Sequence, residues 1–259
     1  MLDVAIEAAK EAGKYLKHHM GKVQEVKHKD EHYTNLVTEI DRRSEEKIIR
    51  KIKQHFPSHD ILAEESGTAH STASPYRWII DPLDGTTNFT HSYPVYAVSI
   101  ALAEREELIL GVIYDPNFDE LFTTERGCGA YLNGRKLHVT ATAAVKNSLL
   151  ATGFPYNVRE NPYHAVEHFN NFLMEAQGIR RLGSAALDLA YVAAGRLDGF
   201  WEVQLNAWDM AAGALLIQEA GGRVTDFDGN TFKISESRIV ASNGAIHDEM
   251  IRVLKKAGA

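Results

Sequence analysis

Cysteine is almost missing from this chain of 259 residues, which contains only Cys128. A lone cysteine cannot form an intramolecular disulfide, and the N-terminal residues lack the apolar core of a secretory signal. No stretch approaches the ~20 consecutive apolar residues that cross a bilayer. These absences predict a soluble, cytoplasmic protein without a membrane partner.

An excess of positive charge is missing as well. Lys and Arg number 28 against 35 Asp and Glu, so the formal net charge is −7. A broad nucleic-acid surface needs clustered Lys and Arg, so the composition argues against nucleic acid as a partner. Repeats and Pro-rich linkers are absent too, and we expect one domain over residues 1–259 with halves at 1–147 and 148–259.

The first half has the pattern of two helices followed by strands. Apolar residues at helical spacing between Leu2 and Leu16 predict the first helix. Thr38 and Asp41 have the spacing of a capping box that begins the second helix, which Pro57 ends. Short apolar runs then predict a largely antiparallel sheet with strands at 61–63, 78–80, 96–102, 108–114, 120–124 and 131–132.

The second half alternates between strand and helix patterns. We expect strands at 149–152, 180–182, 199–203, 223–225 and 239–241, and helices at 162–177, at 184–194, from 208 and at the C-terminus. Alternation of this kind predicts an α/β arrangement with a mixed sheet.

The segment 81–87, Asp-Pro-Leu-Asp-Gly-Thr-Thr, follows an apolar run that ends at Ile80. We expect Pro82 to end the strand and Gly85 to allow a tight turn, so that the Leu83 carbonyl joins the carboxylates of Asp81 and Asp84. Such oxygen clusters suit hard cations. The next backbone amides, from Gly85, Thr86 and Thr87, are placed to open a helix and bind phosphate.

Two further acidic residues stand at the ends of predicted elements. Glu64 follows the strand at 61–63, and Asp209 lies at the start of a long apolar helix. If both converge with Asp81 and Asp84, their mutual repulsion requires a bound cation. All-oxygen ligands without cysteine favour Mg²⁺ or Mn²⁺ over zinc. Each segment taken alone is also compatible with an ordinary polar turn.

Four segments together resemble the signatures of the inositol monophosphatase family of magnesium-dependent, lithium-sensitive phosphatases. They are 35–41 (Asn-Leu-Val-Thr-Glu-Ile-Asp), 64–66 (Glu-Glu-Ser), 78–89 and 208–213 (Trp-Asp-Met-Ala-Ala-Gly). The resemblance spans nearly the whole chain. It implies an α/β fold with α+β character in the N-terminal half: a layered α/β/α/β/α sandwich of the inositol monophosphatase and fructose-1,6-bisphosphatase type. A homodimer is common in that family.

The resemblance also implies roles for individual residues. Glu64, Asp81 and the Leu83 carbonyl would hold one Mg²⁺, Asp81, Asp84 and Asp209 a second, and a weaker third ion would lie near Glu64. Thr86, hydrogen-bonded to Asp41, would orient and deprotonate a metal-activated water near Glu64. The substrate contacts would be Asp84, Gly183, Ser184, Ala185, Glu202 and Asp209. The family's active-site lysine corresponds to either Lys27 or Lys29.

The function that the resemblance implies is Mg²⁺-dependent hydrolysis of myo-inositol monophosphate, and of other small polyol phosphates, to the free polyol and inorganic phosphate. Asn206 stands where animal members often carry His, so the choice of polyol phosphate can differ. Alternative substrates are fructose 1,6-bisphosphate, NADP(H) and 3′-phosphoadenosine phosphate. Arg180 and Arg181 would clamp a second phosphate there, or form a simple surface pair. A regulatory role that binds RNA or the transcription machinery is the alternative from another class.

Overall fold

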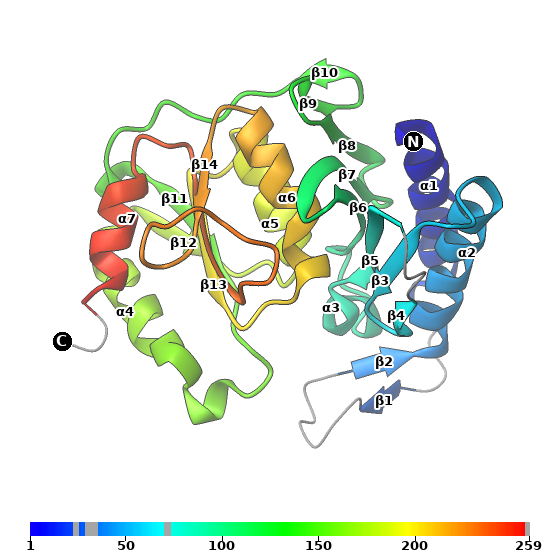
Figure 1. Ribbon diagram of the computed structural model, residues 1–259. Helices are drawn as coiled ribbons and strands as arrows, with labels where there is room; N and C mark the ends of the chain where they lie inside the picture. Colours follow the sequence, from blue (N-terminus) through cyan, green and yellow to red (C-terminus); the bar gives the residue numbers. More distant parts are fainter. Residues whose placement is uncertain (23–25, 29–35, 70–73, 257–259) are drawn as a thin grey trace.

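A computed structural model describes residues 1–22, 26–28, 36–69 and 74–256 of the chain. The elements stack in the predicted α/β/α/β/α order (Figure 1). Two helices cover the outer face of an eight-stranded sheet, two more lie between that sheet and a five-stranded one, and a third pair covers the far face. None of the helices in these ranges is both long enough and apolar enough to cross a bilayer.

The first helical layer consists of α1 (Leu2–His19) and α2 (Glu39–His55). Alanines on the buried face of α1 let it pack closely against α2 and the sheet. The predicted capping box of α2 is confirmed: the Thr38 hydroxyl accepts from the Ile40 and Asp41 N–H groups, and the Thr38 N–H donates to Asp41 Oδ2 at 2.9 Å. This cap fixes the position of the Asp41 carboxylate.

The larger sheet has the strand order β10-β9-β8-β7-β6-β5-β3-β4. Its strands are β3 (Asp60–Ala63), β4 (Gly67–Ala69), β5 (Tyr76–Asp84), β6 (Ala97–Glu104), β7 (Glu107–Asp115), β8 (Glu120–Glu125), β9 (Gly129–Leu132) and β10 (Arg135–Lys136). Every pair is antiparallel except β3 with β5. That parallel pair brings the carboxyl ends of both strands to one edge, where the Glu64 N–H donates to the Ile80 carbonyl. A separate pair, β1 (Val26–His28) with β2 (Leu36–Thr38), is antiparallel.

The expectation that Pro82 ends its strand was wrong, because β5 continues to Asp84. The pairing of β5 with β6 shifts register between Asp81 and Asp84, so Pro82 lies in a bulge that needs no ladder N–H. On the other side, β3 pairs only as far as Ile80. The last residues of β5, from Asp81 to Asp84, therefore have no partner in β3.

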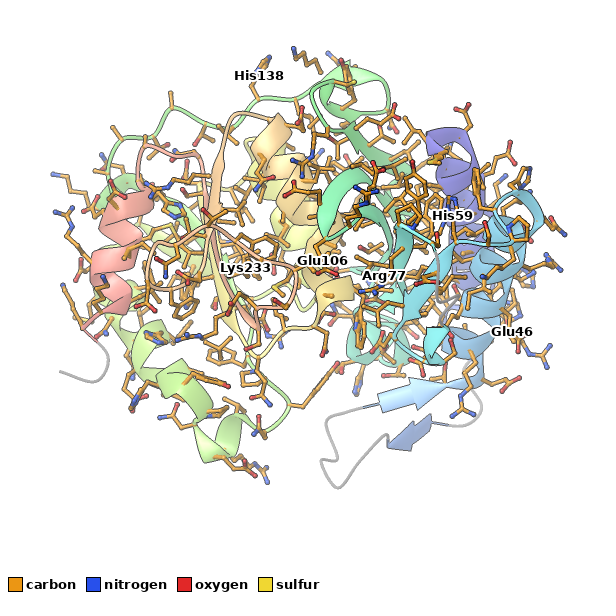
Figure 2. The ribbon with its side chains drawn as sticks, in the orientation of Figure 1. Glu46, His59, Arg77, Glu106, His138 and Lys233 are labelled. Carbon is orange, nitrogen blue, oxygen red and sulfur yellow. The ribbon has the colours of Figure 1, made fainter. Side chains whose placement is uncertain are left out.

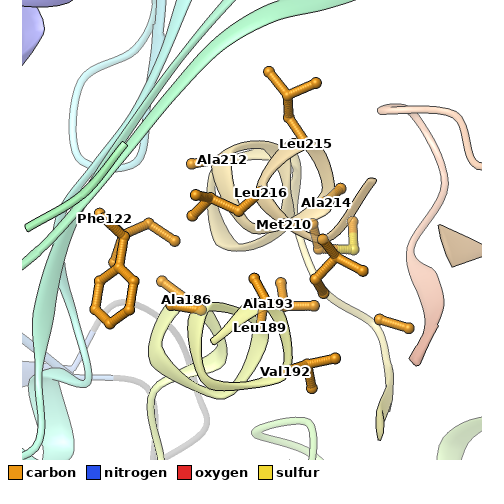
Figure 3. Close-up of a cluster of buried hydrophobic side chains, with 14 of the residues drawn as sticks. Phe122, Ala186, Leu189, Val192, Ala193, Met210, Ala212, Ala214, Leu215 and Leu216 are labelled. Atoms are coloured by element: carbon orange, nitrogen blue, oxygen red, sulfur yellow. The ribbon is translucent and has the colours of Figure 1, made fainter. Parts of the chain in front are cut away.

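Two apolar helices, α5 (Ala185–Ala193) and α6 (Ala207–Glu219), fill the layer between the sheets. In Figure 3, Ala186, Leu189 and Ala193 of α5 lie against Met210 and Leu216 of α6. Gly213 allows this close approach, because a Cβ there would stand 2.4 Å from Leu189 Cβ. The pair connects the two sheets through one continuous core.

The smaller sheet is mixed, as predicted, with the order β12-β11-β13-β15-β14. Its strands are β11 (Leu149–Thr152), β12 (Gly178–Arg180), β13 (Gly199–Val203), β14 (Arg223–Thr225) and β15 (Arg238–Ser242), and α4 (Ala165–Glu175) and α7 (His247–Leu254) cover its outer face. Strand β11 runs parallel to both β12 and β13, and the remaining pairs are antiparallel.

In the second half, two elements differ from expectation by two residues or more. The strand predicted at 180–182 lies at Gly178–Arg180, because Leu182 turns its carbonyl to the Asn88 side-chain amide at 2.8 Å. The helix predicted at 162–177 begins at Ala165, because Tyr163 and His164 have positive φ angles that interrupt a helix.

Charged side chains of both signs are spread over the surface, and Figure 2 labels Glu46, Arg77, Glu106 and Lys233 among them. Arg77 Nη1 lies 3.5 Å from Glu106 Oε1 and links β5 to the turn between β6 and β7. Exposed pairs of this kind add about 0–1 kcal/mol to stability, so the buried layers hold the fold together.

Candidate active site

Three carboxylates from two distant parts of the chain converge at the ends of β5 and α6. One oxygen from each of Asp81, Asp84 and Asp209 lies within 4.8 Å of the other two. Asp81 and Asp84 are buried, and Asp209 is partly exposed. We call these three residues the acidic cluster.

Burial and mutual repulsion both act on this cluster. Burial raises the pKa of Asp81 well above its ordinary value, and the charges of Glu64, Asp84 and Asp209 raise it further. Burial also raises the pKa of Asp84 to about 6, although hydrogen bonds from Ser184 and Ala186 act in the opposite direction. The pKa of Asp209 is raised by burial and then by Glu64 and Asp84. Glu64 therefore lies close enough to raise the pKa of all three aspartates. A bound cation would relieve the repulsion among these four carboxylates.

Asp84 is held by the start of α5. Its Oδ2 accepts from the Ser184 hydroxyl and, at 2.7 Å, from the Ala186 N–H. The Ser184 oxygen also accepts from the Leu187 N–H, as an N-cap does. The turn at 183–185, predicted to contact substrate, thus fixes an acid of the cluster from the opposite half of the chain.

The Thr86 hydroxyl lies between two acceptors. It is 2.9 Å from Asp41 Oδ1 and 3.1 Å from the Leu83 carbonyl. Asp41 is fully buried, and its Oδ2 also accepts from the Thr38 hydroxyl and N–H. Thr86 is the first residue of the short helix α3 (Thr86–Thr90), so the predicted contact between Thr86 and Asp41 joins α3 to α2.

These groups surround one cavity of about 430 Å³. Of the residues predicted for the site, those that line it are Glu64, Asp84, Gly85, Thr86, Thr87, Gly183, Ser184, Ala185, Glu202 and Asp209. Asp81, Leu83 and Asp41 do not line it. Leu83 and Asp41 are both within hydrogen-bond distance of the Thr86 hydroxyl, and an oxygen of Asp81 lies within 4.8 Å of Asp84 and Asp209. The structure describes only the backbone of Lys27, and Lys29 lies outside the described residues.

Known proteins resemble this chain along its full length. The family model described as "Inositol monophosphatase family" matches residues 1–259. The chain belongs to the inositol monophosphatase family. It is therefore a phosphatase of a family that uses metal ions, and the acidic cluster is able to hold them.

Individual relatives agree with the family match. An inositol-1-monophosphatase of Mesorhizobium japonicum is 44% identical over 256 residues, which cover 99% of this chain and 96% of the relative. The Nus factor SuhB of Pseudomonas aeruginosa is 44% identical over 247 residues, covering 94% and 91%. The solved structure of the extragenic suppressor protein SuhB from Bartonella henselae is 43% identical with a TM-score of 0.93, covering 99% and 98%. The layered fold predicted from the family resemblance is confirmed.

The cavity also contains residues that the sequence reasoning did not select, among them Gly153, Tyr156 and Asp188. Gly153 and Tyr156 follow the carboxyl end of strand β11. A position at the end of a strand is the same signal that indicates Glu64 and Asp81, so it could have identified these two residues as well. Tyr156 is 50% exposed, yet desolvation of its phenol and then the charges of Glu64, Asp209, Asp84 and Asp81 raise its pKa. The dependence on these four acids places Tyr156 near the acidic cluster.

The two neighbouring arginines do not act as a pair. Arg181 lines the cavity, whereas Arg180 donates to the Ile179 carbonyl and is not among the lining residues. Arg181 is the one Lys or Arg among the described residues that line this cavity. Burial raises the pKa of Glu202 to about 8, even though the charge of Arg181 acts to lower it. A clamp made of both arginines is thus not formed here.

Glu202 lies directly against the backbone of Gly153. A Cβ at that position would stand 2.1 Å from Glu202 Oε2, so Gly153→Ala is expected to displace the carboxylate. If Glu202 contacts substrate, KM should rise roughly 10-fold or more, the value of one hydrogen bond to a charged group. Steady-state kinetics measure this.

Gly178→Ala is the matched control, because a Cβ there would meet Leu149 Cδ1 at an acceptable 3.4 Å. It should leave KM unchanged. An unchanged KM in Gly153→Ala as well would show that Glu202 does not contact the substrate.

Proposed function

We propose that this phosphatase hydrolyses myo-inositol monophosphate, and other small polyol phosphates, in a Mg²⁺-dependent reaction. The observation that supports this most strongly is the approach of Asp81, Asp84 and Asp209 within 4.8 Å, beside a cavity that also presents Glu202. The three aspartates suit a metal ion that binds phosphate, and Glu202 suits the hydroxyls of a polyol.

The chemistry of the donor set fits divalent magnesium. The side-chain ligands available in the cluster are carboxylates, and Mg²⁺ prefers oxygen. We assign Glu64, Asp81 and the Leu83 carbonyl to one ion, Asp81, Asp84 and Asp209 to a second, and a weaker third to the vicinity of Glu64. When bound, such ions neutralise phosphate charge and lower the pKa of water, which is the chemistry that a phosphate monoester requires. Mn²⁺ is a possible substitute, with the same ligand preference.

The contact between Thr86 and Asp41 supports a role in proton transfer. A hydroxyl has one proton and two lone pairs, so Thr86 can donate to Asp41 Oδ1 while it accepts from a water in the cavity. Asp41 can receive the proton, because burial raises its pKa above the ordinary value. In this proposal Thr86 would orient the attacking water near Glu64.

The start of α3 is proposed to bind the phosphate oxygens. The first intrahelical bond runs from the Phe89 N–H to the Gly85 carbonyl, so the amides just before Phe89 have no intrahelical partner. Gly85 has φ 97°, and a Cβ there would stand 3.0 Å from the Val95 carbonyl oxygen. Only glycine permits this turn without strain. We therefore assign the Gly85, Thr86 and Thr87 amides to phosphate, and the 183–185 turn and Glu202 to the polyol.

A phosphate-release assay tests the proposal. The panel contains myo-inositol 1-phosphate, glycerol 2-phosphate, fructose 1,6-bisphosphate, NADP⁺ and 3′-phosphoadenosine 5′-phosphate, each with Mg²⁺ and with a chelator. We expect the highest kcat/KM with the inositol ester and no turnover without metal. Better turnover of a bisphosphate would overturn the inositol assignment, and full activity in chelator would overturn the metal assignment.

Metal binding is expected to depend on pH. In the metal-free fold, Asp81, Asp84 and Asp209 have raised pKa values, that of Asp84 being about 6. The fold therefore holds protons that the unfolded chain loses above about pH 4. Because the unfolded state then binds fewer protons, the stability of the metal-free protein falls as pH rises from about 4 through these raised values.

Mg²⁺ requires the ionised carboxylates, so its binding should release protons and raise Tm more at pH 8 than at pH 6. Calorimetry in two buffers of different ionisation enthalpy, together with melting curves, measures both effects. NaCl at equal ionic strength is the control. A shift in Tm that does not change with pH would contradict the acidic cluster as the binding site.

A second candidate function is association with RNA or the transcription machinery. Its support is the name Nus factor SuhB carried by the relative from Pseudomonas aeruginosa. Stoichiometric co-purification of RNA polymerase or RNA would favour it, and their absence from the purified protein would weaken it.

Homodimerisation and inhibition by lithium are further proposals from the family resemblance. Light scattering tests the first, and an inhibition curve tests the second.

A further inference from the structure

Asp188 is a buried acid in the first turn of α5 that lines the cavity. Its side chain is 1% exposed, and no described residue supplies a hydrogen-bond partner for its Oδ1. An unpaired polar atom in such a place costs roughly 1–3 kcal/mol, and more if charged. We therefore expect Asp188 to have a role that offsets this cost in stability.

The fold itself gives no such role. The residues on either side of Asp188 in α5 are apolar and buried, so an apolar side chain would suit the packing at this position. The backbone N–H of Asp188 bonds to the Ser184 carbonyl, as in any helix.

Asp115 offers a useful contrast. It is also buried, and its Oδ2 has no partner among the described residues. Its Oδ1, however, accepts from the Asn117 N–H at 2.8 Å and the Phe118 N–H at 3.2 Å, which fixes a turn. Asp115 does not line the cavity. Asp115 thus stabilises a turn outside the cavity. Asp188 lines the cavity, and no hydrogen bond within the described residues gives its side chain a comparable structural role.

The surroundings of Asp188 suit a polyhydroxylated ligand. The charged groups that act on Asp188 are Glu202, Asp84 and Arg181, and all three line the same cavity. The carboxylates of Asp188 and Glu202 and the guanidinium of Arg181 offer both acceptors and donors to hydroxyl groups. A ligand hydroxyl that donates to the Asp188 carboxylate would supply a partner that the protein lacks.

We propose that Asp188 is a specificity-determining residue that, together with Glu202, binds hydroxyl groups of the polyol part of the substrate. This inference rests on the proposed function and extends it, because it names the residue that should separate polyol phosphates from esters without hydroxyls. A site built to bind a hydroxyl rejects an analogue that lacks it, since a buried polar group is then left unpaired.

The test compares two substrates in two variants. Asp188→Leu keeps the number of side-chain heavy atoms and removes the hydrogen-bonding group, while Asp188→Asn keeps one. For myo-inositol 1-phosphate, Asp188→Leu should lower kcat/KM about 10- to 100-fold, mainly through KM, and Asp188→Asn should lose less. For p-nitrophenyl phosphate, which has no polyol, both variants should lose far less. The Tm of Asp188→Leu should stay level or rise, because an unpaired buried acid is removed.

Asp115→Leu is the matched control. It should lower Tm, because the turn loses two hydrogen bonds, and leave the ratio of the two kcat/KM values unchanged. Equal losses on both substrates in Asp188→Leu, or a fall in Tm like that of Asp115→Leu, would show that Asp188 is structural and overturn the inference. The wild-type preference between the two substrates tests the proposed function separately. The effect of Asp188→Leu on the ratio of the two kcat/KM values can be measured whichever substrate the wild type prefers.

Discussion

Asp81→Asn is expected to lower kcat by at least about 10³-fold while the fold stays intact. In the proposed site this carboxylate is shared by two ions, so its charge is lost to both. If the two ions together lose about 4 kcal/mol of transition-state stabilisation, the rate falls by that factor, since 1.36 kcal/mol corresponds to tenfold. Turnover of myo-inositol 1-phosphate at saturating Mg²⁺ measures the loss.

The stability of the same variant separates a damaged site from a damaged fold. Asp81 Oδ1 accepts from the Leu83 N–H at 2.9 Å, and asparagine can keep that bond. The substitution also removes one of the repelling charges, so the metal-free Tm should not fall, whereas the rise in Tm on adding Mg²⁺ should shrink. Asp115→Asn, which changes a buried aspartate outside the cavity, should leave both kcat and the Mg²⁺ response unchanged. Near-normal activity in Asp81→Asn would refute the metal assignment.

Local chemistry explains why much of this site could be predicted. The capping box at Thr38 and Asp41, the acids after short apolar runs and the glycine at 85 each depend on residues close in sequence. Strand ends hold side chains in fixed positions, so an acid at such an end indicates a site before the partner is known. The family resemblance then supplied which of these ends meet.

The features that the sequence did not reveal depend on distant contacts. Asp188 is one polar residue in an apolar helix, and only the packing of α5 beside β13 brings it near Glu202. Arg180 and Arg181 looked equivalent, but β12 ends at Arg180 and the chain then turns toward the cavity. Pro82 looked like a strand end, because a bulge opposite β6 leaves no trace in the residues of β5 alone.

Thr86→Val is expected to lower kcat about 10²- to 10⁴-fold, the range for loss of a positioned proton-transfer group. Valine has the shape of threonine without the hydroxyl, so the bond to Asp41 Oδ1 and the orientation of the attacking water are lost. KM should change little if Thr86 acts on the water rather than on the substrate. Thr86→Ser, which keeps the hydroxyl, should retain most of the rate.

Thr38→Ala is the matched comparison, because Thr38 contacts the same carboxylate through its other oxygen. Losing this N-cap should cost about 1 kcal/mol of stability and leave most of kcat. Thr86→Val should lower kcat far more than Thr38→Ala does, and its stability should fall by roughly 1–3 kcal/mol because the buried Asp41 Oδ1 loses a donor. Asp41→Asn combined with Thr86→Val should be little worse than either change alone if the two residues act as one unit. If their effects on kcat multiply instead, Thr86 and Asp41 act separately, and the path of the proton must be drawn through another group in the cavity.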